Sequence, residues 1–138
     1  MYEKYEVDGH SWIVWPENPN YIISSNGRII SKKTKKYLKL KAKRSGYPFW
    51  TYHINGKRHN IYVHRAVALL FIPFPKPYYL RQEVWDFMED TEKYMFMREN
   101  GIVDHLDRDK SNPRANNLTW SSYSENYKNS DHYENNYV

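Results

Sequence analysis

The 138-residue sequence contains no cysteine, and this absence excludes several kinds of site at once. Without thiols there are no disulfide bonds, no thiolate zinc ligands and no cysteine nucleophile. No window approaches the ~20 consecutive apolar residues of a membrane-spanning helix. Met1 is followed by charged and aromatic residues rather than by an apolar run. We therefore expect no secretion signal, no membrane partner and a cytoplasmic location.

Acidic residues are also absent from Asn18 to Gln82, although the whole chain carries a formal net charge of only +5. The basic residues of this stretch are Arg28, Lys32, Lys33, Lys35, Lys36, Lys39, Lys41, Lys43, Arg44, Lys57, Arg58, Arg65, Lys76 and Arg81. A basic segment without counter-charges attracts polyanions, and nucleic acid is the usual one. A solvated basic surface is the other interpretation, but solubility alone does not require the removal of every acidic residue over this length.

Two Asn-Gly pairs, Asn26-Gly27 and Asn55-Gly56, mark residues 11–75 as a small β-rich unit. Each pair separates two runs of β-branched and aromatic residues, 21–24 from 28–31 and 49–54 from 57–63. Asn-Gly supplies the positive φ angles of tight turns, so we predict two β-hairpins. Apolar residues then recur at helical spacing from Val63 to Phe71, and the prolines that follow predict the end of a helix.

Residues 80–99 are predicted to form one or two helices that carry most of the acidic charge. The Met and aromatic side chains of this segment predict a packed core rather than a ligand site. Asn100-Gly101 is typical of a helix C-terminal cap. The acidity of the segment argues against close contact with a polyanion.

Residues 102–130 hold the most informative polar pattern. We predict strands over 102–106 and 117–120, joined by a polar loop and followed by a helix that contains Asn126. Asp104 and Asn126 supply oxygen ligands of the kind that Mg²⁺ prefers, and a neutral His105 beside such a cation can deprotonate water. On a regular strand Asp104 and His105 point to opposite sides, so one shared site requires a bend or the end of the strand.

Spacing alone does not establish that chemistry. An Asp-His pair is common, and a half-buried strand histidine with an exposed helical asparagine explains the same residues more simply. In the loop, Asp107 is expected to bond backbone N–H groups, as Asx residues do. Tyr37, Tyr47, Trp50 and Tyr52 are expected to pack in the sheet, with stacking on bases as the alternative.

A resemblance to a known family changes this balance. Residues 103–130, VDHLDRDKSNPRANNLTWSSYSENYKNS, resemble the HNH nuclease motif of the homing-endonuclease branch. Residues 63–73, VHRAVALLFIP, resemble the segment that leads into this motif, and residues 12–40 resemble the NUMOD4 module often found before it. Three segments in the expected order are far more specific than any one of them.

The resemblance implies an α+β fold, with an N-terminal antiparallel β-hairpin unit followed by a ββα-metal, or His-Me, finger. It implies a metal-dependent DNA endonuclease in which His105 is the general base and Asn117 holds the loop that poses His105. Asp104 and Asn126 would hold one Mg²⁺ or Mn²⁺ ion, with no small-molecule cofactor. Such a site hydrolyses phosphodiester bonds, leaves 5′-phosphate and 3′-hydroxyl ends, and nicks one strand at a time.

The same resemblance divides the chain into parts. It implies a basic NUMOD4-like DNA-binding module over 1–62, an HNH nuclease domain over 63–130 with a helical insertion at 76–100, and a tail at 131–138. We expect double-stranded DNA as the partner of a monomer or homodimer, in bacterial host cytoplasm if a phage encodes the chain. The residues expected to contact DNA, mainly at phosphates, are Arg28, Lys32, Lys33, Lys35, Lys36, Lys39, Lys41, Lys43, Arg44, Lys57, Arg58, His64 and Arg65.

Several alternatives stay open at this point. His64 can equally be a packing residue, and Arg65 can equally form a surface ion pair. A non-catalytic DNA-binding module with a decayed finger is the second interpretation, although the intact Asp104, His105, Asn117 and Asn126 count against decay. An RNA-binding protein is the third, but no RNA-recognition signature supports it. With no helix-turn-helix segment after Asn126, we expect a short or relaxed target site.

Overall fold

The structure is a computed structural model, and it describes residues 2–7, 9–42 and 44–121. The strands are β1 (Lys4–Val7), β2 (His10–Val14), β3 (Tyr21–Ser24), β4 (Ile29–Ser31), β5 (Lys36–Tyr37), β6 (Lys41–Ala42), β7 (Pro48–Ile54), β8 (Lys57–Tyr62), β9 (Ile102–His105) and β10 (Leu118–Ser121). The helices are α1 (Val63–Phe71), α2 (Gln82–Phe87) and α3 (Asp90–Asn100), with a 3-10 turn at Ala115–Asn117. All strand pairs in this part of the chain are antiparallel, which confirms the predicted α+β class.

The first 62 residues form two sheets, with strand orders β1-β2-β3-β4-β5 and β6-β7-β8. Both predicted Asn-Gly turns are present. Gly27 has a φ of 82°, and a side chain there would lie 2.5 Å from Cγ of Pro113 in a later loop. Asn55 and Gly56 both have positive φ, as a two-residue hairpin turn requires. Sequence analysis missed β1, whose four residues are all exposed and carry no buried alternation.

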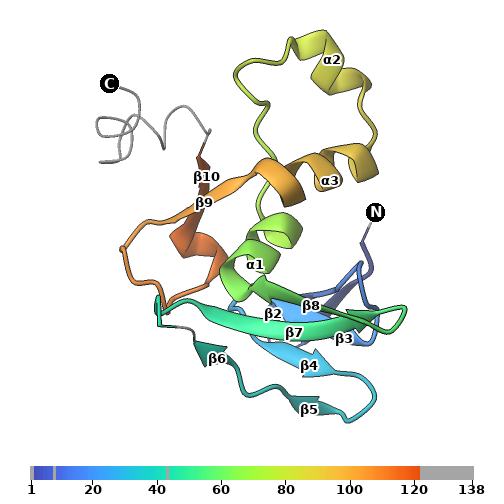
Figure 1. Ribbon diagram of the computed structural model, residues 1–138, viewed down its shortest axis with the longest axis vertical. Coiled ribbons are helices and arrows are strands. Elements are labelled where there is room, and N and C mark those ends of the chain that lie inside the picture. The colour runs from blue at the N-terminus through green and yellow to red at the C-terminus, as the bar shows by residue number, and fades with distance from the viewer. Residues whose placement is uncertain (1, 8, 43, 122–138) are drawn as a thin grey trace.

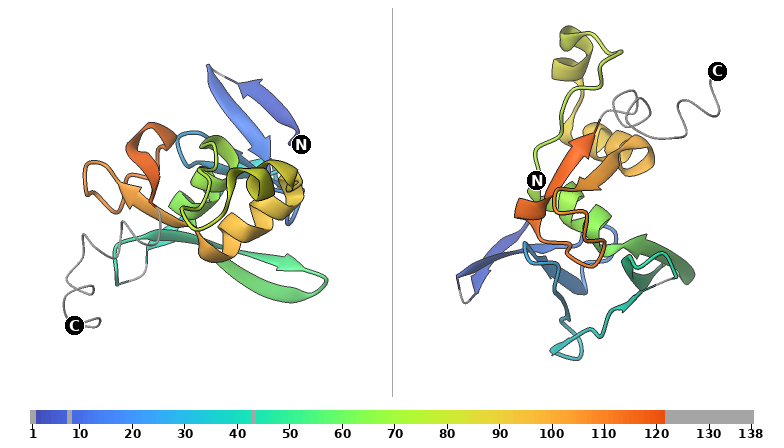
Figure 2. Two further views of the ribbon diagram at one scale, coloured as in Figure 1. Left: turned by 90° about the horizontal axis from the view of Figure 1, so that it is seen from above. Right: turned by 90° about the vertical axis from the view of Figure 1, so that its left-hand side faces the viewer.

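Helix α1 lies at the centre of the molecule, between the β7-β8 sheet and the β9-β10 hairpin (Figures 1 and 2). It buries Val63, Ala66, Val67 and Leu70 at the predicted spacing and ends at Phe71, before the prolines. One hydrophobic cluster runs from the first sheet through α1 to the last hairpin, and both predicted units contribute to it. Its members include Ile13, Trp15, Ile23, Trp50, Val67, Leu118 and Trp120.

Residues 82–100 form two helices, of which α3 packs against α1. A capping box begins α3, because Glu92 Oε1 accepts a bond of 3.0 Å from the backbone N–H of Glu89. Gly101 is the C-terminal cap of α3, as predicted, and it has an extended φ of −69°. A side chain has no room there, because a Cβ would overlap the Trp120 ring and lie 2.7 Å from the carbonyl oxygen of Met97.

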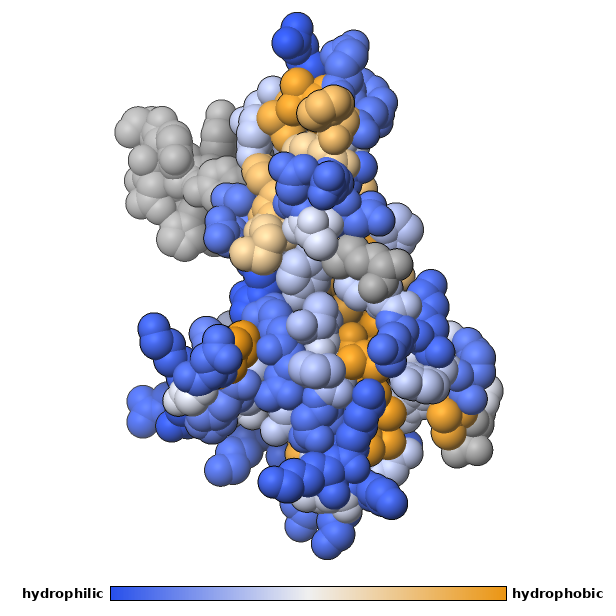
Figure 3. Space-filling view, turned by 90° about the vertical axis from the view of Figure 1, so that its right-hand side faces the viewer, coloured by the Kyte–Doolittle hydropathy of each residue, from blue (hydrophilic) through white to orange (hydrophobic). Residues whose placement is uncertain are grey.

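The apolar stripe predicted to be core in this segment is buried only in part. Trp85, Tyr94 and Met97 are buried, whereas Val84 is exposed and the Phe87 ring is 90% exposed. Helix α2 sits at the tip of an excursion from the body (Figure 1), and Figure 3 shows hydrophobic residues gathered over this tip. The prediction failed because only one side of this short helix has a neighbour. No described helix combines the length and the apolar composition that crossing a bilayer requires.

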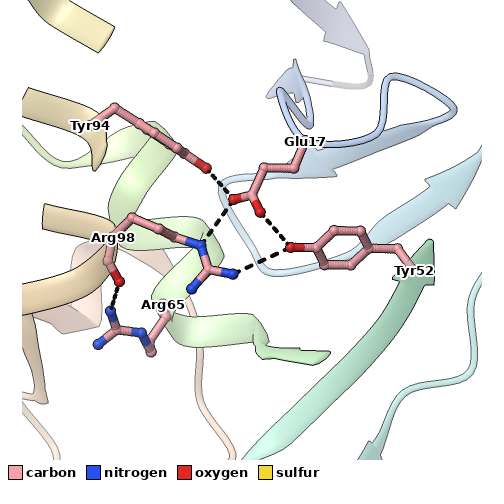
Figure 4. Close-up of polar contacts among 5 residues, drawn as sticks. All are labelled: Glu17, Tyr52, Arg65, Tyr94 and Arg98. Atoms are coloured by element: carbon pink, nitrogen blue, oxygen red, sulfur yellow. Dashed lines mark hydrogen bonds and ion pairs between the residues drawn. The ribbon is translucent and has the colours of Figure 1, made fainter. Parts of the chain in front are cut away.

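A polar cluster fastens α3 to the β-sheets (Figure 4). Glu17 accepts hydrogen bonds from the hydroxyl groups of Tyr52 and Tyr94, both of 2.7 Å, and from Nε of Arg98 at 2.9 Å. Arg65 of α1 donates to the carbonyl oxygens of Arg98 and Gly101, at 2.8 and 2.7 Å. Burial acts to raise the pKa of Glu17, but the bonds from Arg98, Tyr94 and Tyr52 outweigh it and the pKa lies below its usual value.

Candidate active site

The β9-β10 hairpin carries the Asp-His pair at the end of its first strand. Asp104 pairs with Thr119, and His105, the last residue of β9, pairs with the buried Leu118. Neighbouring residues of a strand face opposite sides, so the two side chains have different surroundings. The hydroxyl of Ser121 donates to Oδ2 of Asp104, whereas the His105 ring turns toward α1. The position of His105 at the end of the strand meets the condition under which both residues can serve one site.

Rings from two distant parts of the chain pack beside His105. The His64 ring, from the first turn of α1, has its centroid 4.8 Å from that of His105. The Tyr47 ring lies 5.6 Å from His105 and 4.8 Å from His64, in both cases at an interplanar angle near 35°. Nε2 of His105 and Nδ1 of His64 are buried, and neither has a hydrogen-bond partner among the described residues. Within the described part of the chain, packing against these two rings is what holds the buried side of the His105 ring.

Both imidazoles favour the neutral form. Burial lowers the pKa of His64 to about 4, with smaller contributions from His105 and Arg65. Burial also lowers the pKa of His105, and the carboxylates of Asp107, Asp109 and Asp104 oppose this effect only in part. A neutral imidazole is the form that accepts a proton.

Asn117 connects the two ends of the polar loop that follows His105. Its side chain is buried, its Oδ1 accepts a bond of 3.0 Å from the backbone N–H of Asp107, and its Nδ2 donates to Oδ1 of Asp107 at 2.9 Å. Nδ2 also donates to the carbonyl oxygen of Asn112 at 3.0 Å. Asp107 in turn accepts from the backbone N–H of Asp109 at 2.7 Å. The predicted Asx role of Asp107 is present, and hydrogen bonds lower the pKa of its carboxyl group.

The described part of the site fits a hard divalent cation better than zinc. No group of three His, Asp or Glu side chains within residues 2–7, 9–42 and 44–121 is arranged to hold a metal. Asp104 offers a half-buried carboxylate with one oxygen already bonded to Ser121. Mg²⁺ accepts few protein ligands and keeps water, so one carboxylate and one amide oxygen suit it. The expected second ligand, Asn126, lies outside the described residues, as does the predicted helix that carries it.

The basic residues predicted to contact DNA are mostly exposed around the two sheets. Those with exposed side chains are Arg28, Lys32, Lys33, Lys35, Lys36, Lys39, Lys41, Arg44, Lys57 and Arg58. The Arg28 guanidinium lies 4.9 Å above the centre of the Tyr37 ring, so this tyrosine is exposed beside a cation rather than packed in the sheet. Trp50 and Tyr52 are buried as predicted. Lys43 lies outside the described residues.

Two residues assigned to the DNA surface occupy other places. His64 is buried in the ring cluster next to His105, so packing, the alternative left open by the sequence, describes it. The guanidinium of Arg65 binds the carbonyl oxygens at the C-terminal end of α3. It forms no ion pair among the described residues, and its contact with phosphate stays a prediction.

Sequence analysis missed three basic residues that lie beside His105, in the loop after β9. Arg108, Lys110 and Arg114 are exposed, and the loop touches the basic sheets, since the N–H of Ala115 donates to the carbonyl oxygen of Ser25 at 2.8 Å. Sequence analysis did not identify them because Asp107 and Asp109 alternate with them, so the loop has little net charge. Tyr47 was also missed as a neighbour of His105, since nothing in the sequence links distant segments.

Comparison with known proteins gives consistent relatives. The chain is 27% identical over 124 residues to the uncharacterized HNH endonuclease L245 of Acanthamoeba polyphaga mimivirus, covering 90% of this chain and 31% of that protein. It is 36% identical over 90 residues to the H-N-H endonuclease F-TflII of Escherichia phage T5, covering 65% of this chain and 45% of that protein. No protein-family model matches the sequence.

A solved structure shows the same fold. It is that of the HNH homing endonuclease I-HmuI, from work on its DNA binding and cleavage, with a TM-score of 0.59 and 25% sequence identity. The match covers 92% of this chain and 56% of that one. The chain thus spans less than half the length of the two curated relatives and just over half of the structural neighbour. The relatives confirm the resemblance to HNH endonucleases, while the resemblance to NUMOD4 stays a prediction.

Proposed function

Starting from relatives that are HNH endonucleases, we propose that this chain is a metal-dependent endonuclease that hydrolyses phosphodiester bonds in double-stranded DNA. The observation that carries the proposal is the β9-β10 hairpin, which ends in Asp104-His105 and whose loop is fastened by Asn117. A decayed finger would not need to keep this arrangement of buried and bonded polar groups.

His105 serves as the general base in this proposal. Its Nε2 is buried and has no hydrogen-bond partner among the described residues. We assign the proton-accepting role to Nδ1, because water does not reach the buried Nε2. The lowered pKa keeps the ring in its accepting form near neutral pH. Asn117, through the backbone N–H of Asp107, fixes the start of the loop two residues after His105.

Asp104 and Asn126 would hold one Mg²⁺ or Mn²⁺ ion. When bound, such an ion supplies positive charge to the scissile phosphate and to the leaving 3′ oxygen. The hydroxyl of Ser121 orients the Asp104 carboxylate by donating to Oδ2. A single site of this kind cuts one strand per visit, so the products are expected to be nicks with 5′-phosphate and 3′-hydroxyl ends.

The DNA surface is proposed to extend from the loop beside His105 onto the two sheets. Arg108, Lys110 and Arg114 provide exposed charge next to the site, and the loop meets the turn that precedes the basic segment at Arg28. Phosphate contacts of this kind give affinity and orientation without reading the sequence. Helix α2, with the exposed Glu83 and Asp86, lies at the end of the molecule opposite to the two sheets (Figure 1), away from phosphates bound to the sheets.

The test is conversion of supercoiled plasmid with Mg²⁺ or Mn²⁺, with EDTA, and with His105→Ala protein. Open circles that require both metal and His105 would establish the nuclease. His53→Ala is the matched control, because His53 is an exposed histidine on β7, outside the candidate site. If His105→Ala cleaves as the wild type does, the base is wrongly assigned. A salt-sensitive gel shift without any cleavage by the wild type would favour the non-catalytic binding module.

A further inference from the structure

Tyr47 belongs to the connection between β6 and β7, yet its ring lies in the candidate active site. The local sequence fixes its direction. Gly46 has a φ of 86°, which turns the chain sharply, and Pro48, the first residue of β7, restricts Tyr47 to an extended backbone. The ring is half-buried. This short Gly-Tyr-Pro segment therefore delivers one aromatic side chain to a fixed place, from a part of the chain distant in sequence from His105.

The Tyr47 ring packs beside three other rings and one lysine at the candidate site. Its centroid is 5.6 Å from that of His105, 4.8 Å from that of His64 and 5.4 Å from that of Tyr62. On the loop side, Nζ of Lys110 lies 5.3 Å from the ring centre, in cation–π geometry. No hydrogen bond in the described part of the chain involves the Tyr47 hydroxyl group. The interactions on which its position depends are thus made by the ring.

These contacts matter for the orientation of the His105 ring. Its buried Nε2 has no hydrogen-bond partner among the described residues, so no bond from those residues to this nitrogen sets the angle of the ring. Two flat rings, Tyr47 and His64, do this by packing. Tyr47 differs from His64 because its ring also contacts the ammonium group of Lys110, which belongs to the loop after β9.

We propose that Tyr47 is a positioning residue, whose ring sets the orientation of the His105 imidazole and holds the Lys110 ammonium group beside it. The proposal rests on the proposed nuclease function for its effect on cleavage, but the orientation of His105 can be measured without it. A nuclease base displaced by about 1 Å loses on the order of a hundredfold in rate. The first 62 residues would then supply a part of the cleavage site as well as a DNA surface.

The first experiment compares Tyr47→Leu, which keeps apolar volume but no ring, with Tyr47→Phe, which keeps the ring without the hydroxyl. We expect Tyr47→Leu to reduce the single-turnover nicking rate at saturating protein at least about tenfold, with the dissociation constant for DNA changed less than about twofold. Tyr47→Phe should restore most of the rate. Tyr78→Ala removes an exposed ring elsewhere and controls for the loss of an aromatic residue. A wild-type rate in Tyr47→Leu, or equal losses in Tyr47→Leu and Tyr47→Phe, would overturn the proposal.

The second experiment reads the orientation of His105 through a contact that does not include Tyr47. The ring protons of His105, assigned by their disappearance in His105→Ala protein, should give nuclear Overhauser contacts to the ring protons of His64, whose centroid lies 4.8 Å away. These contacts should be retained in Tyr47→Phe and weakened or lost in Tyr47→Leu. If they are unchanged in Tyr47→Leu, the ring does not orient His105. This measurement needs no cleavage. A wild-type protein that fails to nick DNA would therefore overturn the proposed function, while the NMR spectrum would still decide whether Tyr47 positions His105.

Discussion

Replacing Glu17 by alanine should destabilise the whole fold, because one carboxylate joins three elements. The change leaves the hydroxyl groups of Tyr52 and Tyr94 and the guanidinium of Arg98 without their acceptor. The Tyr94 side chain is buried, and leaving one such group unpaired costs about 1–3 kcal/mol. The ion pair adds less than a fully buried one, since the Arg98 and Glu17 side chains are 25% and 20% exposed. We expect a total loss of about 3 kcal/mol.

Urea denaturation followed by tryptophan fluorescence measures this loss. Glu6→Ala is the matched control, because Glu6 also accepts a hydrogen bond, from Ser11 at 2.7 Å, but is exposed. The control should stay within about 0.5 kcal/mol of the wild type. If Glu17→Ala also unfolds within that margin, the cluster does not fasten α3 to the sheets, and the argument from its hydrogen bonds is refuted.

The same carboxylate gives a pH signature. In the folded protein the pKa of Glu17 lies below its ordinary value of 4.5, so the ionised form favours folding. Its contribution is fully present above the ordinary value and is lost as the pH falls through the lowered pKa. The difference in unfolding free energy between wild type and Glu17→Gln should therefore be constant near neutral pH and shrink under acid conditions. A difference that stays constant down to the acid end would contradict the lowered pKa.

Three further changes test other parts of the structure. Gly101→Ala should lower the unfolding free energy by about 1–3 kcal/mol, because the added Cβ overlaps the Trp120 ring; an unchanged urea midpoint would refute the packing argument. Lys35→Ala with Lys36→Ala should weaken DNA binding for all sequences and reduce the slope of log affinity against log salt by about 2, while Lys4→Ala, on β1, should leave the slope unchanged. Asn117→Ala should slow nicking about ten- to a hundredfold with little loss of DNA binding, and a rate equal to the wild type would contradict its role in the loop.

Local signals explain the elements that could be predicted from the sequence. Asn55-Gly56 specifies its hairpin because both residues adopt positive φ without help from distant parts of the chain. Helix α1 was predictable because its apolar residues recur at helical spacing and prolines follow it. Asp107 was predictable for the same reason, since its bonds reach only a few residues along the loop and to Asn117.

Features decided by tertiary packing could not be predicted in this way. Gly101 is the predicted cap of α3, but the sequence does not reveal that the Trp120 ring leaves no room for a side chain there. Phe87 belongs to an apolar stripe that predicts burial, yet nothing covers it among the described residues. Arg65 carries the charge of a phosphate contact, but the end of α3 takes up its guanidinium. In each case the outcome depends on which residues of distant segments lie nearby, and the periodicity of the sequence does not reveal them.

The contact between the basic sheets and the hairpin makes the proposed DNA surface and the candidate site parts of one packed structure. The turn at Gly27 has no room for a side chain because Pro113 of the loop packs on it, and Ser25 bonds the backbone of Ala115. Tyr47 reaches the imidazole of His105 from the other sheet. In the proposed nuclease, phosphates held by the exposed lysines of the sheets are thereby placed in a fixed relation to the loop and to His105, although none of those lysines belongs to the candidate site.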